Sequence, residues 1–239
     1  MRWLDRCRDW MLRYDPVRSE HLEELHHYGF VRQLSELIPS NAIIVSDTGG
    51  NVIMMGHCFR SKIGQRIFSS NGNTPMGFAL AGAMGAWFAQ PERPVICIIG
   101  DGGMQLNIQE LQTIRHYKVP LKVFILNNGI LGNTKSYQRV NNKAELACGP
   151  DGYSTPNFVD IAVAYGIESF RLWNLGDLKD ALADQGPLIV DVPHLEFCTY
   201  EPRLSRWDAP IEEMHPPLPG KEFLDNMLVE PLEGWESRR

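Results

Sequence analysis

Three short segments of the sequence combine glycines with oxygen-bearing side chains, and each directly follows an apolar run. Residues 47–51 follow AIIVS, residues 100–103 follow VICII, and residues 127–133 follow LKVFIL. In open parallel sheets, ligands bind outside the carboxyl ends of the strands. Glycines let backbone N–H groups approach phosphate oxygens closely, and a carboxylate beside them can hold a cation. These segments therefore predict a metal-assisted phosphate site.

The spacing of Asp101 and Asn128 carries more weight than either residue alone, because a lone Asp-Gly pair is usually only a turn. Asn128 lies 27 residues after Asp101, at the end of the next apolar run. One helical crossover fits this interval and would bring both side chains to the same sheet edge. A carboxylate, an amide oxygen, a backbone carbonyl and phosphate oxygens suit Mg²⁺ better than a soft metal. The seven histidines are too scattered to indicate a zinc site.

The elements that must position these residues alternate along the chain, since apolar runs predict strands and the periodic segments between them predict helices. The expected strands are 42–46, 66–68, 94–100, 121–127, 168–172 and 188–192, and the expected helices are 20–37, 77–89, 104–117, 156–166 and 176–186, with a further helical stretch after residues 47–50. Runs without alternation indicate strands buried on both faces. The pattern predicts an α/β fold, a three-layer doubly wound parallel sheet.

Three regions are expected along the chain: an N-terminal amphipathic helix in residues 1–18, the α/β domain in residues 19–195, and an extended tail in residues 196–239. Trp3 and Trp10 share the apolar face of the first helix. That face packs either on this domain or against another chain. The tail is rich in proline and charge, so we expect it to wrap across a surface with one short helix near 221–227.

Composition narrows the class of protein. The 239 residues, 44% hydrophobic and 22% charged, are ordinary for one large globular domain. A net charge of −6 without a basic cluster argues against nucleic acid as a partner. No apolar run approaches the length of a membrane span, and the N-terminus is unlike a signal peptide. Five scattered cysteines without CxxC spacing indicate reduced, structural thiols. A cytoplasmic protein is expected.

The segment GDGGMQLNIQELQTIRHYKVPLKVFILNNG resembles the signature of enzymes that use thiamine diphosphate (ThDP), which opens with GDG and closes with NN. SDTGGN, SNGNTPMGFALAGAMGA, PNFVDIAVAYG and the tail from PRLSRW to NMLVEPLE are similar to the C-terminal, diphosphate-binding domain of the acetolactate synthase-like family. The likeness extends over nearly the whole chain. It implies the PP-type ThDP-binding fold, with ThDP and Mg²⁺ as cofactors.

The resemblance also implies a role for individual residues. Asp101, Asn128 and the backbone carbonyl of Ile130 would bind Mg²⁺. Met76, whose type alone would suggest a flexible core side chain, would prop ThDP into a bent shape that brings its 4′-amino group near C2 of the thiazolium. A helix starting near Met104 would turn its positive end to the diphosphate. The cofactor-binding residues implied are Gly49, Gly50, Asn51, Thr74, Met76, Gly100, Asp101, Gly102, Gly103, Asn128, Ile130, Leu131, Gly132 and Asn133.

The resemblance further implies a second protein part. In this family the catalytic glutamate, which contacts N1′ of the pyrimidine, belongs to an N-terminal pyrimidine-binding domain. We expect that glutamate to come from a partner polypeptide or from another part of a longer protein. The first arrangement, a hetero-oligomer built on dimers, is the favoured expectation. The isolated chain should then be inactive.

The implied reaction is decarboxylation of a small-molecule 2-oxo acid and transfer of the acyl carbanion to a carbonyl acceptor. Residues 132–138 differ from the methionine-rich stretch ending in Gln-Trp that acetolactate synthases carry, so the acceptor can differ from pyruvate or 2-oxobutyrate. In this expected loop, Lys135 and Tyr137 either bind a carboxylate, phosphate or sugar hydroxyl, or are an ordinary solvated lysine and a packed tyrosine.

Two other readings stay open. One is a two-subunit 2-oxo acid decarboxylase of the sulfopyruvate or phosphonopyruvate type, and the other is a non-catalytic regulatory module with the ThDP fold. The intact pair Asp101 and Asn128 argues against the module. The lack of clustered cysteines argues against a ferredoxin-coupled oxidoreductase subunit.

Overall fold

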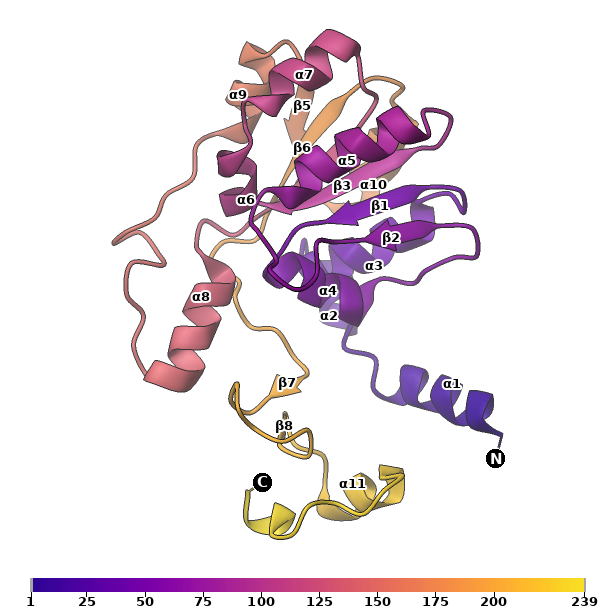
Figure 1. The fold of residues 1–239 in the computed structure, drawn as a ribbon, viewed down its shortest axis with the longest axis vertical. Helices are drawn as coiled ribbons and strands as arrows, with labels where there is room; N and C mark the ends of the chain where they lie inside the picture. The colour runs from indigo at the N-terminus through magenta and orange to yellow at the C-terminus, as the bar shows by residue number, and fades with distance from the viewer. Residues whose placement is uncertain (1, 239) are drawn as a thin grey trace.

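Six parallel strands form a single sheet in the order β2-β1-β3-β4-β6-β5 in this computed structural model, which describes residues 2–238 (Figure 1). The strands are β1 (Ile43–Ser46), β2 (Arg66–Phe68), β3 (Val95–Gly100), β4 (Lys122–Asn127), β5 (Glu168–Arg171) and β6 (Leu188–Pro193). All the pairings in this sheet are parallel. The predicted fold class is confirmed.

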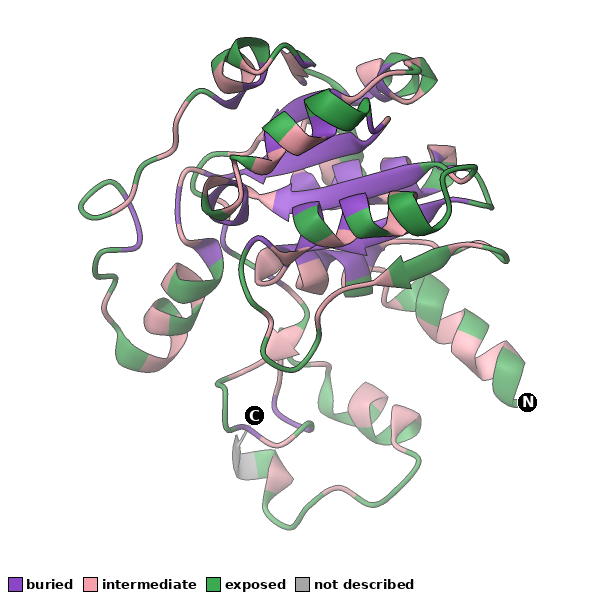
Figure 2. Cartoon of the chain, turned by 45° about the horizontal axis from the view of Figure 1, so that its top comes forward, coloured by how far each residue is buried: buried purple, intermediate pink, exposed green. Residues whose placement is uncertain are grey.

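Helices cover both faces of the sheet and bury its alternating side chains. Ile44 and Ile96 belong to one hydrophobic core, whereas Ile43 and Val95 belong to the other, because successive residues of a strand point to opposite faces. The first core is covered by α3 (His27–Leu37), α4 (Gly50–Cys58) and α10 (Leu178–Ala183), and the second by α5 (Phe78–Ala89), α7 (Glu110–Tyr117) and α9 (Phe158–Ala164). Figure 2 shows the buried residues gathered in the strands between these layers.

The order of the strands explains why the three glycine-containing segments meet. β3 lies between β1 and β4, with Ile43 opposite Val95 and Ile96 opposite Lys122. β2 pairs with the edge of β1 that faces away from β3. The chain therefore moves one way across the sheet from β1 to β2 and then returns past β1 to form β3. Such a switch point leaves a crevice at the carboxyl ends of the strands. Each segment begins at one of these neighbouring ends.

The helix predicted at 20–37 is wrong as a single element. The structure has α2 (Ser19–Glu23) and then α3, which begins at His27. His26 interrupts the helix because its Nδ1 accepts a 2.9 Å hydrogen bond from the backbone N–H of Tyr28 and caps α3. A Cβ on Gly29 would lie 1.7 Å from the carbonyl oxygen of His21, so the close approach of α2 requires a glycine there.

The helix predicted at 104–117 is also two helices, α6 (Asp101–Leu106) and α7. The helix begins at Asp101 rather than near Met104, so the GDGG residues form its N-cap and first turn. At the break, Nδ2 of Asn107 donates a 2.7 Å hydrogen bond to the carbonyl oxygen of Gly77. This long-range bond, which sequence periodicity cannot reveal, joins the end of α6 to the start of α5.

The segment expected as a loop after Asn128 is helical. α8 (Gly132–Tyr137) continues into a π-helical turn (Gln138–Asn142). The backbone N–H of Lys135 donates to the carbonyl oxygen of Leu131 at 2.8 Å, which starts the helix directly after the glycine-rich turn. Nζ of Lys135 lies 3.5 Å from a carboxylate oxygen of Glu145, and its side chain is only 12% exposed, so it is not a solvated lysine.

The first helix, α1 (Trp3–Arg13), packs on the C-terminal tail rather than on the sheet. Nε1 of Trp10 donates a 2.5 Å hydrogen bond to Oδ1 of Asn226, and the Tyr14 hydroxyl donates to Glu222 at 2.7 Å. Trp3 stays 60% exposed, and α1 contributes no buried residue. The structure has α1 where the sequence predicted a first helix, and the part of the chain that contacts it is the tail.

The tail contains more regular structure than expected. β7 (Arg203–Leu204) and β8 (Met214–His215) pair as a short antiparallel hairpin, followed by α11 (Gly220–Asn226) and a 3₁₀ turn (Trp235–Arg238). α11 confirms the short helix predicted near 221–227. None of the helices in the described part of the chain has the length and apolar character needed to cross a membrane.

Candidate functional site

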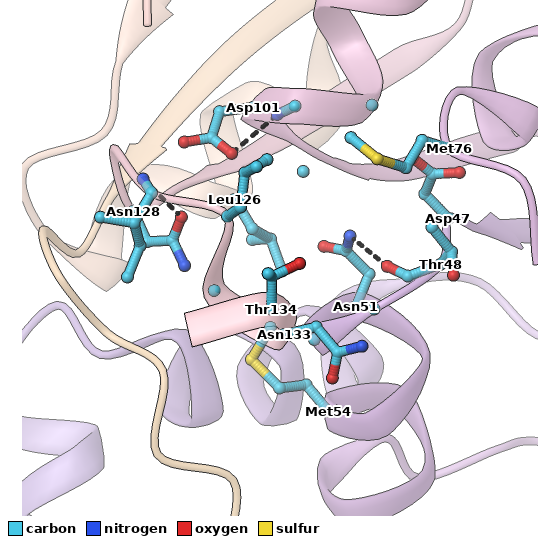
Figure 3. Close-up of a pocket in the computed structure, with 18 of the residues that line it drawn as sticks. Asp47, Thr48, Asn51, Met54, Met76, Asp101, Leu126, Asn128, Asn133 and Thr134 are labelled. Atoms are coloured by element: carbon cyan, nitrogen blue, oxygen red, sulfur yellow. Dashed lines mark hydrogen bonds between the residues drawn. The ribbon is translucent and has the colours of Figure 1, made fainter. Parts of the chain in front are cut away.

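A cavity of about 290 Å³ opens at the carboxyl ends of β1, β3 and β4 (Figure 3). All fourteen residues that the sequence predicted to bind the cofactor line this cavity. They come from the segments after three strands and from the connection that leads into α5. The fold thus brings residues from distant parts of the sequence to one place.

Asp101 is a buried carboxylate held by two backbone N–H groups. Gly102 donates to Oδ1 at 2.7 Å, and Gly129 donates to Oδ2 at 2.8 Å. Asp101 is only 4% exposed, and this burial raises its pKa to about 6, although the two N–H groups act in the opposite direction. The protein alone therefore compensates the negative charge of Asp101 incompletely, and a cation would stabilise it.

Asn128 lies beside Asp101 with a fixed amide group. Its Nδ2 donates a 2.7 Å hydrogen bond to the carbonyl oxygen of Phe197, while Oδ1 accepts a long 3.3 Å bond from the N–H of Ile130. The bond to Phe197 determines which end of the amide is free for a ligand, because Nδ2 is already engaged. Figure 3 shows Asp101 and Asn128 on the same side of the cavity. Oδ1 has a second lone pair beyond the long bond from Ile130, so it can serve as a Mg²⁺ ligand.

Asp47 positions the segment that carries Met76. Oδ2 of Asp47 accepts a 3.0 Å hydrogen bond from the backbone N–H of Gly77, which is the residue after Met76. Asp47 is 1% exposed, and burial raises its pKa. A Cβ on Gly103 would lie 1.9 Å from Oδ2 of Asp47, so the site has no room for a side chain there. Asp47 thus joins the ends of β1 and β3 to the start of α5.

Met76 projects into the site from this connection. Its side chain is not a core filler, because Met76 is 40% exposed. A Cβ on Gly102 would lie 2.7 Å from Cε of Met76, which places the thioether directly over the first turn of α6. The sulfur and methyl group therefore form an apolar surface above the residues that carry the oxygen ligands.

Several residues that line the cavity were not among the fourteen implied cofactor-binding residues. Asp47 and Thr48 lie within segment 47–51, which the sequence singled out without giving either residue a role of its own. His27 on α3 and Tyr200 beyond β6 had no such local signal. The additional lining residues are His27, Asp47, Thr48, Met54, Leu126, Thr134 and Tyr200.

Nowhere in residues 2–238 do three or more His, Cys, Asp or Glu side chains form a group that could hold a metal. A metal in this cavity would therefore depend on one carboxylate together with neutral amide, carbonyl and ligand oxygens. That donor set favours a hard cation such as Mg²⁺.

Comparison with known proteins identifies the family. The family described as thiamine pyrophosphate enzyme, C-terminal TPP binding domain, matches residues 47–192, which is more than half of the chain. The chain belongs to this family. Thiamine pyrophosphate is another name for ThDP, so membership of this ThDP-binding domain family implies ThDP with Mg²⁺ as its cofactor. The matched residues include the three glycine-containing segments.

Curated relatives of this ThDP-binding domain include acetolactate synthases. The probable large subunit from Methanocaldococcus jannaschii is 30% identical over 203 residues, which cover 80% of this chain and 34% of that protein. The isozyme 3 large subunit of Escherichia coli strain K12 is 31% identical over 190 residues, covering 76% and 33%. The enzyme of Arthrospira platensis is 37% identical over 166 residues, covering 67% and 28%. The resemblance to the C-terminal domain of this group is confirmed, and the chain spans about a third of these relatives.

Proposed function

We propose that this chain is the Mg²⁺- and ThDP-binding part of an acetolactate synthase-like enzyme. The enzyme decarboxylates a 2-oxo acid and transfers the remaining acyl group to a carbonyl acceptor. The observation that carries the proposal is the arrangement of Asp101 and Asn128 at neighbouring strand ends, joined by the bond from Gly129 to Asp101. Relatives named acetolactate synthase support the reaction class.

The residues at the cavity fit a hydrated divalent cation. Asp101 supplies the only charge of the proposed protein ligands, and its raised pKa reflects the cost of burying that charge without a partner. Asn128 supplies its amide oxygen, and Ile130 supplies its backbone carbonyl. Phosphate oxygens and water would complete the shell of the Mg²⁺ ion.

Backbone groups fit the diphosphate. Gly49, with φ of +69°, is the N-cap of α4, and the first N–H groups of a helix have no partner within that helix. The positive end of the α4 dipole favours an anion at Gly50 and Asn51. Gly132 and Asn133 line the same cavity, and a Cβ on Gly49 would lie 3.5 Å from Cβ of Asn133. The proposed site thus neutralises the diphosphate with one metal and main-chain N–H groups in a protein of net negative charge.

Met76 is proposed to hold the cofactor in the bent shape. When bound, ThDP supplies the electron sink that 2-oxo acid decarboxylation needs. Met76 limits the conformations of the ring system by its apolar bulk, and Asp47 fixes the backbone beside it. Together these residues orient the cofactor and exclude water from its apolar face.

We propose that a pyrimidine-binding domain supplies the glutamate that contacts the cofactor pyrimidine, either in a partner subunit or elsewhere in a longer protein. The support is that the chain spans only about a third of its curated relatives. In the partner arrangement, the active assembly is a hetero-oligomer built on dimers. The active site then lies at an interface, and this chain needs its counterpart for turnover.

The experiment combines the chain with candidate pyrimidine-domain proteins, ThDP and Mg²⁺, and measures CO₂ release from pyruvate and other 2-oxo acids. CO₂ together with a coupled hydroxyketone product supports the carboligase. CO₂ with an aldehyde alone would identify the decarboxylase reading instead. ThDP binding without CO₂ from any substrate and partner would contradict the proposal and favour a regulatory module.

A further inference from the structure

Tyr200, in the segment after β6, reaches the cofactor cavity from outside the part of the chain that the family match covers. The match ends at residue 192. Tyr200 is 4% exposed and lines the cavity. A Cβ on Gly50 would lie 2.3 Å from the Tyr200 hydroxyl oxygen, and a Cβ on Gly132 would lie 2.8 Å from it. The hydroxyl therefore lies between two glycines of the proposed diphosphate cradle.

The hydroxyl of Tyr200 has no hydrogen-bond partner among the residues that the structure describes. The ring is well packed, with Phe197 in an edge-to-face contact at 5.5 Å between centroids. The hydroxyl lies at the cavity beside Gly50 and Gly132, so it is placed to donate a hydrogen bond to a ligand bound there. Burial also raises the pKa of Tyr200, so the phenol stays protonated and can act as a donor.

The backbone on both sides of Tyr200 is fixed. The N–H of Glu196 donates to the carbonyl oxygen of Asn128 at 2.8 Å, and Nδ2 of Asn128 donates to Phe197 at 2.7 Å. After Tyr200, the N–H of Glu201 donates to the Tyr28 hydroxyl at 3.0 Å. The same short segment thus orients the proposed metal ligand Asn128 and holds the phenol in place.

We propose that the Tyr200 hydroxyl donates a hydrogen bond to a phosphate oxygen of the bound diphosphate. The segment 196–200 then forms a wall of the cofactor site, although the sequence suggests only an extended tail there. This inference rests on the proposed function, because it takes the ligand to be an organic diphosphate held with Mg²⁺. It adds a side-chain donor to a cradle otherwise built from main-chain N–H groups.

The test compares Tyr200→Phe with the wild-type full chain by calorimetric titration with Mg²⁺-ThDP and with Mg²⁺-diphosphate. We expect roughly tenfold weaker binding of both ligands, since one hydrogen bond to a charged acceptor is lost. Without ligand, the melting temperature of Tyr200→Phe should be unchanged or higher, because the ring packing is kept and an unpartnered hydroxyl is removed. Tyr165→Phe, at the C-cap of α9 on the other face of the sheet, removes the same group away from the cavity and should bind like wild type.

The inference would be overturned if Tyr200→Phe bound both ligands as tightly as wild type. If wild type bound them and Asp101→Ala did not, the proposed function would remain intact. A lower melting temperature of Tyr200→Phe without ligand would also overturn the inference, because the hydroxyl would then have a structural role. An equal loss of ligand affinity in Tyr165→Phe would also overturn the inference. Failure of the wild-type chain to bind either ligand would overturn the proposed cofactor site and this inference together.

Discussion

The backbone N–H of Gly129 donates a 2.8 Å hydrogen bond to Oδ2 of Asp101. Because Gly129 directly follows Asn128, this bond connects the end of β4 to the residue that follows β3. Gly129 has φ of +70°, a conformation that glycine adopts without strain. The two proposed metal ligands are therefore brought together by the backbone before any metal is bound.

Asp101→Ala should abolish Mg²⁺-dependent ThDP binding while the fold is retained. The substitution removes the only charged ligand and leaves the N–H groups of Gly102 and Gly129 without their acceptor. Calorimetry with and without Mg²⁺ measures the binding, and circular dichroism checks the fold. Asp180→Ala, which removes an exposed carboxylate from α10, is the matched control. Unchanged ThDP binding by Asp101→Ala would refute the metal assignment.

Met76→Ala should slow activation of the cofactor much more than it weakens binding. Loss of the apolar support lets ThDP leave the bent shape, and a misplacement of about 1 Å can cost roughly 100-fold in rate. The rate of proton exchange at C2 of the thiazolium, followed by NMR in the assembled enzyme, is the measurement. Met76→Leu keeps the bulk and should retain most of the rate. A loss confined to affinity would count against the supporting role.

Gly103→Ala and Gly85→Ala should have opposite effects on stability. The new Cβ at position 103 would lie 1.9 Å from Oδ2 of Asp47, so we expect a loss of about 3 kcal/mol in the free energy of unfolding. Gly85 lies within α5, and nothing lies within 4 Å of a Cβ built there. Gly85→Ala should therefore add up to about 1 kcal/mol. Urea denaturation of both variants measures the difference, and equal effects would show that the contact with Asp47 relaxes freely.

Stability should fall as the pH is lowered from 7 to 5, partly because of His27. Burial lowers the pKa of His27 to about 3, and its Nε2 contacts the carbonyl oxygen of Val192 at 2.9 Å. The unfolded chain takes up a proton near pH 6.5 and the folded chain does not, so stability is lost progressively between pH 6.5 and 3. Between pH 7 and 5, His27 alone contributes a loss of about 2 kcal/mol.

The test of this pH dependence uses urea denaturation of His27→Gln at both pH values. Its neighbours His26 and His194 titrate as well, and Asp101, whose raised pKa of about 6 makes the folded chain take up a proton, offsets part of the loss. The quantity compared is therefore the change in the free energy of unfolding between the two pH values, in the variant and in wild type. Between pH 7 and 5, His27→Gln should lose less of its free energy of unfolding than wild type does. His116→Gln, at an exposed site, should match wild type. Identical slopes in His27→Gln and wild type would disprove the assignment.

Local patterns sufficed for much of the core of the fold. The apolar runs predicted the strands, because a strand buried on both faces must be apolar over its whole length. The two predicted helices that failed were each split where a side chain hydrogen-bonds to the backbone, locally at His26 and over a long range at Asn107. His26 caps α3, and Asn107 bonds to Gly77, so a periodic pattern that continues through the break carries no sign of it.

The amino-acid sequence by itself singled out Asp101 and Asn128 as a pair. One helical crossover between neighbouring parallel strands fits the interval of 27 residues between them. Only the tertiary structure decided which distant residues complete the cavity. Tyr200 and the Phe197 carbonyl reach it through the path of the chain after β6, and Asp47 reaches Gly77 through the order of the strands. These contacts join residues far apart in the chain, and no local spacing encodes such pairs.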